Sequence, residues 1–366
     1  MTTMLAARGH AGDSTVRLEQ IDVPEPGPDD VIVKVASAGL APGMMLLLAR
    51  GAFRHLPTTL GHEAAGTIEA VGSDVDAALV GRRVRVHPVL ACRCCVYCQT
   101  DREQMCTESA MIGHAAFGTG PLALYARYHD GGFAEYIRVP HWLVDTLPDN
   151  VSFDVGAKVH DLANAVRALK CTSLPLGGTL LVTAATGTMG TATIKLAPFF
   201  GAARVILVGR SAERLEALRA LAGPLAVDTV ALEDLDPDWA QSQGLTRRIR
   251  ALAPAGVDAV TDYFPEGPGS TQALASLATG GTLVHMGANT TPFLLPAIAI
   301  MVNLWRIVGT RACTRTDAAD VLRLLGSGAL QVDELITHEY PLAEIDAALT
   351  SVQERREPMW MGVVHP

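Results

Sequence analysis

The rhythm of apolar and polar positions changes near residue 150. Before that point, short β-branched runs are bounded by glycine or proline, a pattern typical of strands joined by tight turns. We expect such strands at residues 31–35, 67–71, 83–86 and 134–139. The first part of the chain is therefore predicted to be a β-rich domain.

From residue 179 onward, apolar strands alternate with helical stretches. Strands are expected at residues 180–183, 204–208, 257–260 and 282–285, with helices between them. This alternation predicts βαβ units and a doubly wound parallel sheet covered on both faces, so the fold class is α/β. After residue 300 we expect a strand at 305–312, a helix from Asp317, and a final strand at 361–364 that returns to the first domain.

Length and charge narrow the class of protein. The 366 residues, 49% hydrophobic but only 5% aromatic, are enough for two domains. A net charge of -9 leaves no basic face for a phosphate backbone, so we expect no nucleic-acid partner. No run approaches the roughly 18 apolar residues of a membrane span, and the N-terminus lacks the pattern of a signal peptide. We expect a cytoplasmic protein that acts on a small-molecule substrate.

Five of the seven cysteines lie close together, between Cys92 and Cys106. A reducing cytoplasm disfavours disulfides, whereas four thiolates at close spacing match the closed tetrahedral set of a structural zinc. The predicted ligands are Cys92, Cys95, Cys98 and Cys106, in a lobe at about residues 90–108. Cys94 is expected to be a bystander.

A glycine-rich loop follows the strand that ends at Thr183. It reads as A-x-G-x-x-G, and its residues are Ala185, Thr186, Gly187, Thr188, Met189 and Gly190. At a strand-to-helix turn, the second glycine lets the backbone approach a pyrophosphate and the third lets helix and strand pack closely. Helix amides would then hold the phosphates, so the loop predicts a dinucleotide cofactor.

The end of the next strand indicates which dinucleotide binds. An acidic residue that would accept the ribose hydroxyls of NAD is missing from Gly209, Arg210 and Ser211. Arg210 and Arg214, with the Ser211 hydroxyl, instead suit a 2′-phosphate, which favours NADP(H). Otherwise Ser211 simply caps the helix and both arginines are solvated. Met286 and Gly287, at the end of a later strand, are expected to offer backbone groups to the nicotinamide carboxamide.

The ordered motifs together resemble one family. The chain is similar to the medium-chain dehydrogenase/reductase superfamily, in its zinc-containing alcohol dehydrogenase branch. The resemblance rests on five segments: residues 23–28 (VPEPGP), 61–66 (GHEAAG), the cysteine set, 131–136 (GGFAEY) and the loop at 185–190.

This resemblance implies a GroES-like catalytic domain interrupted in sequence by a Rossmann domain. We place the catalytic domain at residues 1–152 and 300–366, and the NADP-binding domain at 153–299. The family also implies hydride transfer to or from a nicotinamide in a cleft between the domains, and a homodimer or homotetramer formed through the sheet edge at residues 305–312.

The sequence departs from the family at the catalytic zinc. Ala41 stands where the family places a cysteine ligand, and Gly43 stands where it places the relay hydroxyl. His62 and Glu63 remain from the zinc motif, and Asp161 falls near the third ligand position, with His160 as its rival.

Two interpretations of this site compete. His62, Glu63 and Asp161 could hold a zinc with an open position for substrate, as in a zinc-dependent alcohol dehydrogenase. We favour the second, in which the catalytic zinc is absent and the protein is an NADP(H)-dependent reductase of an activated C=C, C=N or C=O. His62 or another donor then supplies the proton. A third possibility is a non-catalytic NADP-binding sensor.

Two further segments, one apolar and one containing aromatic residues, are expected to have structural roles. Residues 44–48 are expected to pack in the core. Residues 111–130 are interpreted as a surface loop, with shaping of the substrate site as the alternative.

Overall fold

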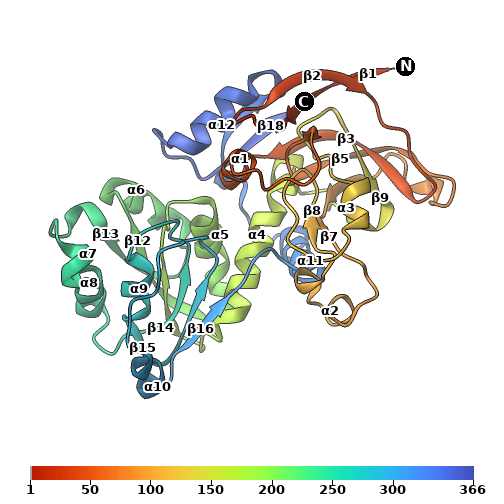
Figure 1. The fold of residues 1–366 in the computed structure, drawn as a ribbon. Coiled ribbons are helices and arrows are strands. Elements are labelled where there is room, and N and C mark those ends of the chain that lie inside the picture. Colours follow the sequence, from red (N-terminus) through yellow and green to blue (C-terminus); the bar gives the residue numbers. More distant parts are fainter. Residues whose placement is uncertain (1) are drawn as a thin grey trace. The chain divides into compact units, whose positions relative to one another are not determined.

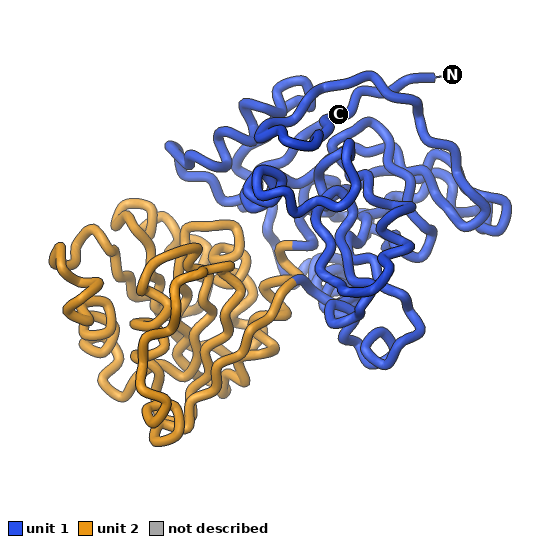
Figure 2. The backbone as a smooth tube through the Cα atoms, viewed as in Figure 1, with its two compact units in different colours: residues 1–160, 312–366 blue, residues 161–311 orange. Residues whose placement is uncertain are grey.

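A computed structural model describes residues 2–366. Two compact units divide the chain: residues 1–160 with 312–366, and residues 161–311 (Figure 2). Our sequence-based boundaries were 152/153 and 299/300. Helix α4 (Phe153–Thr172) crosses the first division. Among residues 2–366, no helix has both the length and the apolar character that crossing a bilayer requires.

The first unit is built around a seven-stranded sheet. Strands run in the order β10-β6-β5-β3-β18-β17, and β9 pairs with β3 (Figure 1). Their bounds are β3 (Asp30–Gly39), β5 (Ala64–Val71), β6 (Arg83–Val86), β9 (Tyr136–Pro140), β10 (Val144–Thr146), β17 (Ile336–Pro341) and β18 (Met361–His365). The pairing of β18 with β3 confirms that the chain returns to this unit.

Smaller elements complete the first unit. One sheet joins β2, β1 and β4, and another joins β7 and β8. Their bounds are β1 (Thr3–Gly9), β2 (Arg17–Asp22), β4 (Thr58–Thr59), β7 (Val89–Leu90) and β8 (Ala110–Met111). The helices are α1 (Gly43–Ala49), α2 (Val96–Gln99), α3 (Ala123–Arg127), α11 (Arg315–Gly326) and α12 (Ile345–Glu354).

The expected core role of residues 44–48 is confirmed for three of them. Met44, Met45 and Leu48 of α1 are buried in the core of the first unit, whereas Leu46 is exposed. The helix thus turns one apolar face inward, as its 3.6-residue period requires.

The second unit is a six-stranded sheet in which every neighbouring pair is parallel. Its order, β13-β12-β11-β14-β15-β16, is that of the doubly wound dinucleotide-binding fold (Figure 1). The strands are β11 (Gly178–Val182), β12 (Ala202–Gly209), β13 (Ala226–Ala231), β14 (Val257–Asp262), β15 (Leu277–His285) and β16 (Arg306–Gly309).

Helices connect these strands. They are α5 (Thr188–Leu196), α6 (Ala212–Glu216), α7 (Trp239–Ser242), α8 (Gly244–Leu252), α9 (Gly269–Leu274) and α10 (Ala297–Asn303). Helices α5, α6 and α9 lie where the alternating pattern predicted helices, whereas α7, α8 and α10 were not predicted. Strand interiors such as Leu181, Ile206 and Val260 are fully buried, which fits near-continuous apolar runs covered on both faces.

Candidate functional site

The four predicted zinc ligands converge. The Sγ atoms of Cys92, Cys95, Cys98 and Cys106 all lie within 4.8 Å of one another. The Cys95–Cys98 and Cys92–Cys98 Sγ separations are 3.5 and 3.9 Å. Tetrahedral sulfur ligands at zinc lie about 3.8 Å apart, close to these two separations, so the set fits the ion.

Backbone amides around the cysteine set stabilise thiolates. The Cys95 amide donates to Cys92 Sγ at 3.4 Å, and the Glu108 amide donates to Cys106 Sγ at the same distance. Such donation, first from the backbone of Cys94, lowers the pKa of Cys92 to about 6. Cys94 itself is exposed, in keeping with a bystander. The four residues would hold a zinc that ties α2 to the segment before β8, and all four coordination positions would be filled by protein.

His62 lies in a buried cluster of three imidazoles. The ring centroids of His62 and His114 are 4.8 Å apart, and those of His62 and His160 are 5.3 Å apart. All three residues are less than 10% exposed. His62 follows directly on the turn before β5, His114 follows β8, and His160 belongs to α4, so three distant segments meet here.

Burial keeps this cluster uncharged. Desolvation, followed by the neighbouring His114, His160 and Lys158, lowers the pKa of His62 well below its usual value. Desolvation likewise lowers the pKa of His114 to about 4. The Nδ1 atoms of both rings are buried and have no hydrogen-bond partner among the described protein atoms. Both rings are therefore neutral at pH 7.

Glu63 is neutralised by a lysine that the sequence reasoning missed. Lys158 Nζ donates to Glu63 Oε2 at 2.5 Å and to the Leu40 carbonyl at 3.2 Å. Both side chains are at most 1% exposed. The other carboxylate oxygen, Oε1, lies 3.8 Å from His62 Nε2, so the carboxylate stands between Lys158 and His62. A lone lysine in the otherwise apolar run 155–159 was the available signal.

Among the described residues, the ligand atoms around His62 are not gathered as closely as those of the cysteine set. Among residues 2–366, ligand atoms come within 4.8 Å of one another in two groups, the cysteine set and Asp154–Glu339–His365, and neither includes His62, Glu63 or Asp161. Cys313 is buried, and its Sγ lies 3.4 Å from Nδ1 of His160, a residue of α4. Asp161 follows on α4 as the first residue of the second unit, and its assignment as a ligand stays a prediction.

The predicted cofactor loop forms the turn between β11 and α5. Ala185 is fully buried, Gly187 caps the helix, and Thr188, Met189 and Gly190 form its first turn. A Cβ on Gly190 would lie 2.3 Å from the Ala185 carbonyl oxygen, so only glycine permits this close approach. The loop thus has the geometry of a pyrophosphate-binding turn.

The residues predicted to read the ribose lie where β12 ends and α6 begins. Gly209 closes the strand, Ser211 is the N-cap of α6, and Arg210 is exposed. Glu233 Oε1 accepts a hydrogen bond from the Ala212 amide at 2.7 Å. A carboxylate therefore already occupies the amide end of α6, beside the predicted phosphate site.

An Asp–His pair at the carboxyl ends of β14 and β15 was also missed. His285 Nδ1 lies 2.7 Å from Asp262 Oδ2, and the Thr183 hydroxyl donates to Asp262 Oδ1 at 2.6 Å. Met286 and Gly287 follow His285, and the Met286 amide donates to the Asp262 carbonyl. In doubly wound sheets ligands bind at these strand ends. The sequence feature that could have indicated this pair is a polar residue at the end of each of two neighbouring apolar strands.

The interpretation of residues 111–130 as a surface loop is wrong. Ile112, Leu122 and Tyr125 of this segment are at most 2% exposed, and the Tyr125 hydroxyl donates to the His114 carbonyl at 2.5 Å. Apolar contacts with the core of the first unit bury these side chains. The segment delivers His114 to His62.

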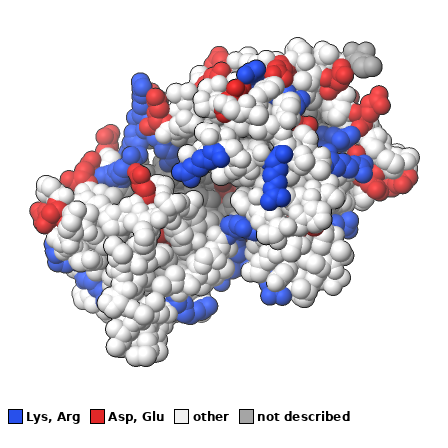
Figure 3. Space-filling view, viewed as in Figure 1, with Lys and Arg blue, Asp and Glu red and all other residues white. Residues whose placement is uncertain are grey.

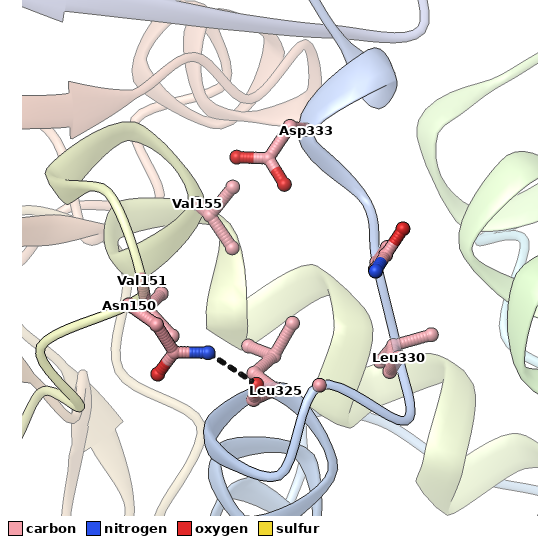
Figure 4. Close-up of a pocket in the computed structure, with 8 residues that line it drawn as sticks. Asn150, Val151, Val155, Leu325, Leu330 and Asp333 are labelled. Atoms are coloured by element: carbon pink, nitrogen blue, oxygen red, sulfur yellow. Dashed lines mark hydrogen bonds between the residues drawn. The ribbon is translucent and has the colours of Figure 1, made fainter.

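Elsewhere, the first unit has a cavity of about 160 Å³ between the segment before α4 and the end of α11 (Figure 4). Its lining mixes aliphatic and polar residues, and the Asn150 amide is already bonded to the Leu325 carbonyl at 3.0 Å. Asp333 is the one ionisable residue lining it. This cavity offers no set of groups for a reaction.

Comparison with known proteins agrees with this architecture. The profile of the alcohol dehydrogenase GroES-like domain matches residues 27–149, and that of the zinc-binding dehydrogenases matches residues 188–327. A GroES-like domain combined with a dinucleotide-binding sheet defines the medium-chain dehydrogenases/reductases. The chain belongs to the zinc-containing, alcohol dehydrogenase-like family of this class, and it is an oxidoreductase.

Several relatives cover nearly the whole chain. It is 28% identical to a sorbitol dehydrogenase of Bombyx mori over 353 residues, 95% of each chain. It is 27% identical to an L-idonate 5-dehydrogenase of Vitis vinifera, over 92% of this chain and 87% of that one. A zinc-binding dehydrogenase of Sinorhizobium meliloti 1021, solved with NADP bound, superimposes with a TM-score of 0.83 at 25% identity over the whole of both chains. The alcohol dehydrogenase of Thermus sp. ATN1 gives 0.82 at 26% identity, over 99% of both.

Proposed function

We propose that the protein is an NADP(H)-dependent reductase of an activated C=C, C=N or C=O in a small organic molecule, with one structural zinc and no catalytic zinc. The observation that carries this proposal is the buried Lys158–Glu63 pair beside Ala41. The family's thiolate position has no ligand, and the neighbouring carboxylate already has a cation. A divalent ion would find few anionic groups left to compensate it.

The chemistry is a hydride transfer followed by a proton transfer. When bound, NADP(H) would supply the hydride for the electrophilic carbon, and the partner atom of the reduced double bond would take a proton from solvent. We assign His62 to the proton-transfer part of the reaction. Its ring is neutral at pH 7, so it acts as a hydrogen-bonding group that steadies the developing charge and not as a standing acid.

The preference for NADP(H) is supported by the residues around Ser211. Arg210 and Arg214 offer guanidinium groups, no acidic residue ends β12, and a structure similar to this chain was solved with NADP bound. Glu233 at the start of α6 opposes this preference, and its carboxylate would have to release the Ala212 amide to a phosphate.

The direct test is NADPH oxidation with a panel of enones, iminium ions and aldehydes. Consumption of NADPH by at least one activated class, with little oxidation of simple alcohols by NADP⁺, is expected. No consumption across the whole panel would favour the sensor interpretation and would contradict the proposal.

A second candidate is a zinc-dependent alcohol or polyol dehydrogenase using His62, Glu63 and Asp161. The names of the relatives favour it, because they include sorbitol and L-idonate dehydrogenases. The unpartnered Nδ1 atoms of His62 and His114 also leave nitrogen atoms available. Two zinc ions per chain, together with loss of activity in Asp161→Ala, would establish this candidate.

We further propose a homodimer or homotetramer formed through the β16 edge of the second unit. Ile298, Met301, Val302 and Leu304 in and after α10 are each more than 60% exposed. Figure 3 shows the tip of the second unit that carries α10 as largely free of charged groups. An exposed apolar patch next to a sheet edge is typical of a subunit interface.

A further inference from the structure

Lys158 is held in the interior of the first unit. Its ammonium has two described oxygen partners, Glu63 Oε2 and the carbonyl of Leu40. The residue is fully buried, so its charge cannot reach bulk water. Lysine is almost never buried to this extent unless it is paired.

The backbone of Gly39 packs closely against the Lys158–Glu63 pair. Gly39 of β3 lies against both side chains: a Cβ at this position would meet Glu63 Oε2 at 2.1 Å and Lys158 Cδ at 2.9 Å. The Gly39 amide also donates to the Glu63 carbonyl at 2.9 Å, which fixes β3 against the start of β5. Ala41 follows two residues later, so the missing thiolate position adjoins the carbonyl that Lys158 binds.

The Lys158 ammonium and the Glu63 carboxylate face one another with 2.5 Å between Nζ and Oε2, and both side chains are buried. A divalent cation at His62 would add two positive charges near this buried ammonium. At separations of a few ångströms in a protein interior, like charges repel strongly.

We propose that Lys158 is a positioning residue whose buried ammonium replaces the divalent cation as the counter-charge of Glu63 and excludes a metal ion from the His62 centre. This inference rests on the proposed zinc-free function, and it adds a physical cause for the absence of a catalytic zinc. Loss of the thiolate at Ala41 removes a ligand, whereas Lys158 acts against any ion that the remaining ligands could still attract. Lys158 is not a catalytic residue, because it is enclosed by β3, Glu63 and the body of α4.

The test restores the thiolate with and without the lysine. Zinc is titrated calorimetrically into wild type, Ala41→Cys and Ala41→Cys/Lys158→Gln, each with its cysteine lobe already loaded. Glutamine retains an amide donor for Leu40 and Glu63 but carries no charge. We expect the double variant to bind a second zinc at least ten-fold more tightly than Ala41→Cys, because the repulsion has been removed.

A matched pair of controls covers folding. Ala41→Cys/Lys158→Met removes the charge with a different side chain, in case the glutamine variant fails to fold, and Ala41→Cys/Lys158→Arg keeps the charge and should bind as weakly as Ala41→Cys. Equal second-zinc affinity with and without the lysine charge, or no second zinc in either neutral variant, would overturn the role of Lys158. A second tight zinc in the wild type would instead overturn the proposed zinc-free function, so the two failures are distinguishable.

Discussion

At the scale of single residues, the partners of Glu63 differ from those that the motif GHE alone suggests. One carboxylate oxygen of Glu63 accepts a hydrogen bond from Lys158, and the other lies 3.8 Å from His62 Nε2. Burial lowers the pKa of His62 and of His114, so both rings are neutral at pH 7. In the proposed function, His62 belongs to the proton-transfer part of the reaction.

The cofactor preference can be tested at Arg210. Arg210→Asp removes a guanidinium from the predicted 2′-phosphate site and adds a repelling charge, so KM for NADPH should rise by roughly ten-fold or more, with KM for NADH little changed. Steady-state kinetics with both cofactors measures this. An unchanged KM for NADPH would show that Arg210 is only a solvated surface residue.

A substitution at Glu233 should have the opposite effect on NADPH binding at the same predicted site. Glu233→Gln removes the carboxylate that accepts from the Ala212 amide, so NADPH should bind several-fold more tightly. Fluorescence titration with NADPH measures this, and Glu216→Gln, on the exposed side of α6, is the control. Weaker binding in Glu233→Gln would mean that the carboxylate organises the site instead of competing with phosphate.

A buried histidine outside the site should couple stability to pH. Desolvation and then Arg85, whose Nη2 lies 2.8 Å from His87 Nδ1, lower the pKa of His87 well below 6.5. Below about pH 6.5, His87 therefore binds a proton in the unfolded chain but not in the folded chain. The free energy of unfolding falls as the pH drops through this range. His87 contributes up to about 1.4 kcal/mol per pH unit to this loss.

His87→Gln should remove that contribution, because glutamine can still accept from Arg85 but does not titrate. Urea unfolding at pH 7 and pH 5 measures the change, with His141→Gln at the surface as the control. If wild type and His87→Gln lose equal free energy of unfolding on acidification, the buried ring is not the cause.

At the scale of elements, the apolar rhythm was sufficient to place most strands. The predicted strands at 31–35 and 83–86 lie within β3 and β6, and that at 204–208 lies within β12. The cysteine spacing likewise predicted a set of four sulfurs that the structure brings together. Local patterns carry this information because strands and closely spaced ligands depend on neighbouring residues.

The group of residues around His62 could not be predicted from local sequence patterns in this way. His114, Lys158 and Glu63 come from segments separated by tens of residues, and only the folded sheet brings them together. Residues 111–130 were interpreted as a surface loop between the cysteine lobe and the GGFAEY segment. Tertiary burial contradicts that interpretation.

The loop between β11 and α5 gives a prediction at this scale. Gly190→Ala would place a Cβ against the Ala185 carbonyl, so stability should fall by about 1–3 kcal/mol and NADPH binding should weaken. Thermal unfolding with and without NADPH measures both effects. Gly43→Ala, which meets nothing within 4 Å, should be nearly neutral; equal effects of the two variants would refute the close approach at Gly190.

At the scale of the whole molecule, each unit carries part of the chemistry. The first unit holds the cysteine lobe and the His62 centre, and the second holds the nucleotide loop and the exposed α10 face. Together the two units have the architecture of a zinc-containing medium-chain dehydrogenase.

The apolar face on α10 should govern assembly. Ile298→Asp/Met301→Asp places charges on the proposed interface, so a dimer or tetramer should dissociate, which light scattering coupled to gel filtration would detect. Leu176→Asp, at a residue 93% exposed elsewhere on the same unit, is the control. A wild-type monomer would contradict the proposed interface.

The central claim is a single zinc per chain. The most direct measurement is the zinc content of the purified protein by mass spectrometry of its metals, compared with Cys95→Ser, which breaks the cysteine set. The zinc-free catalytic centre predicts one zinc per chain in the wild type and none in Cys95→Ser. Two zinc ions in the wild type, with one retained in the variant, would show that the His62 centre binds metal and would contradict the proposal.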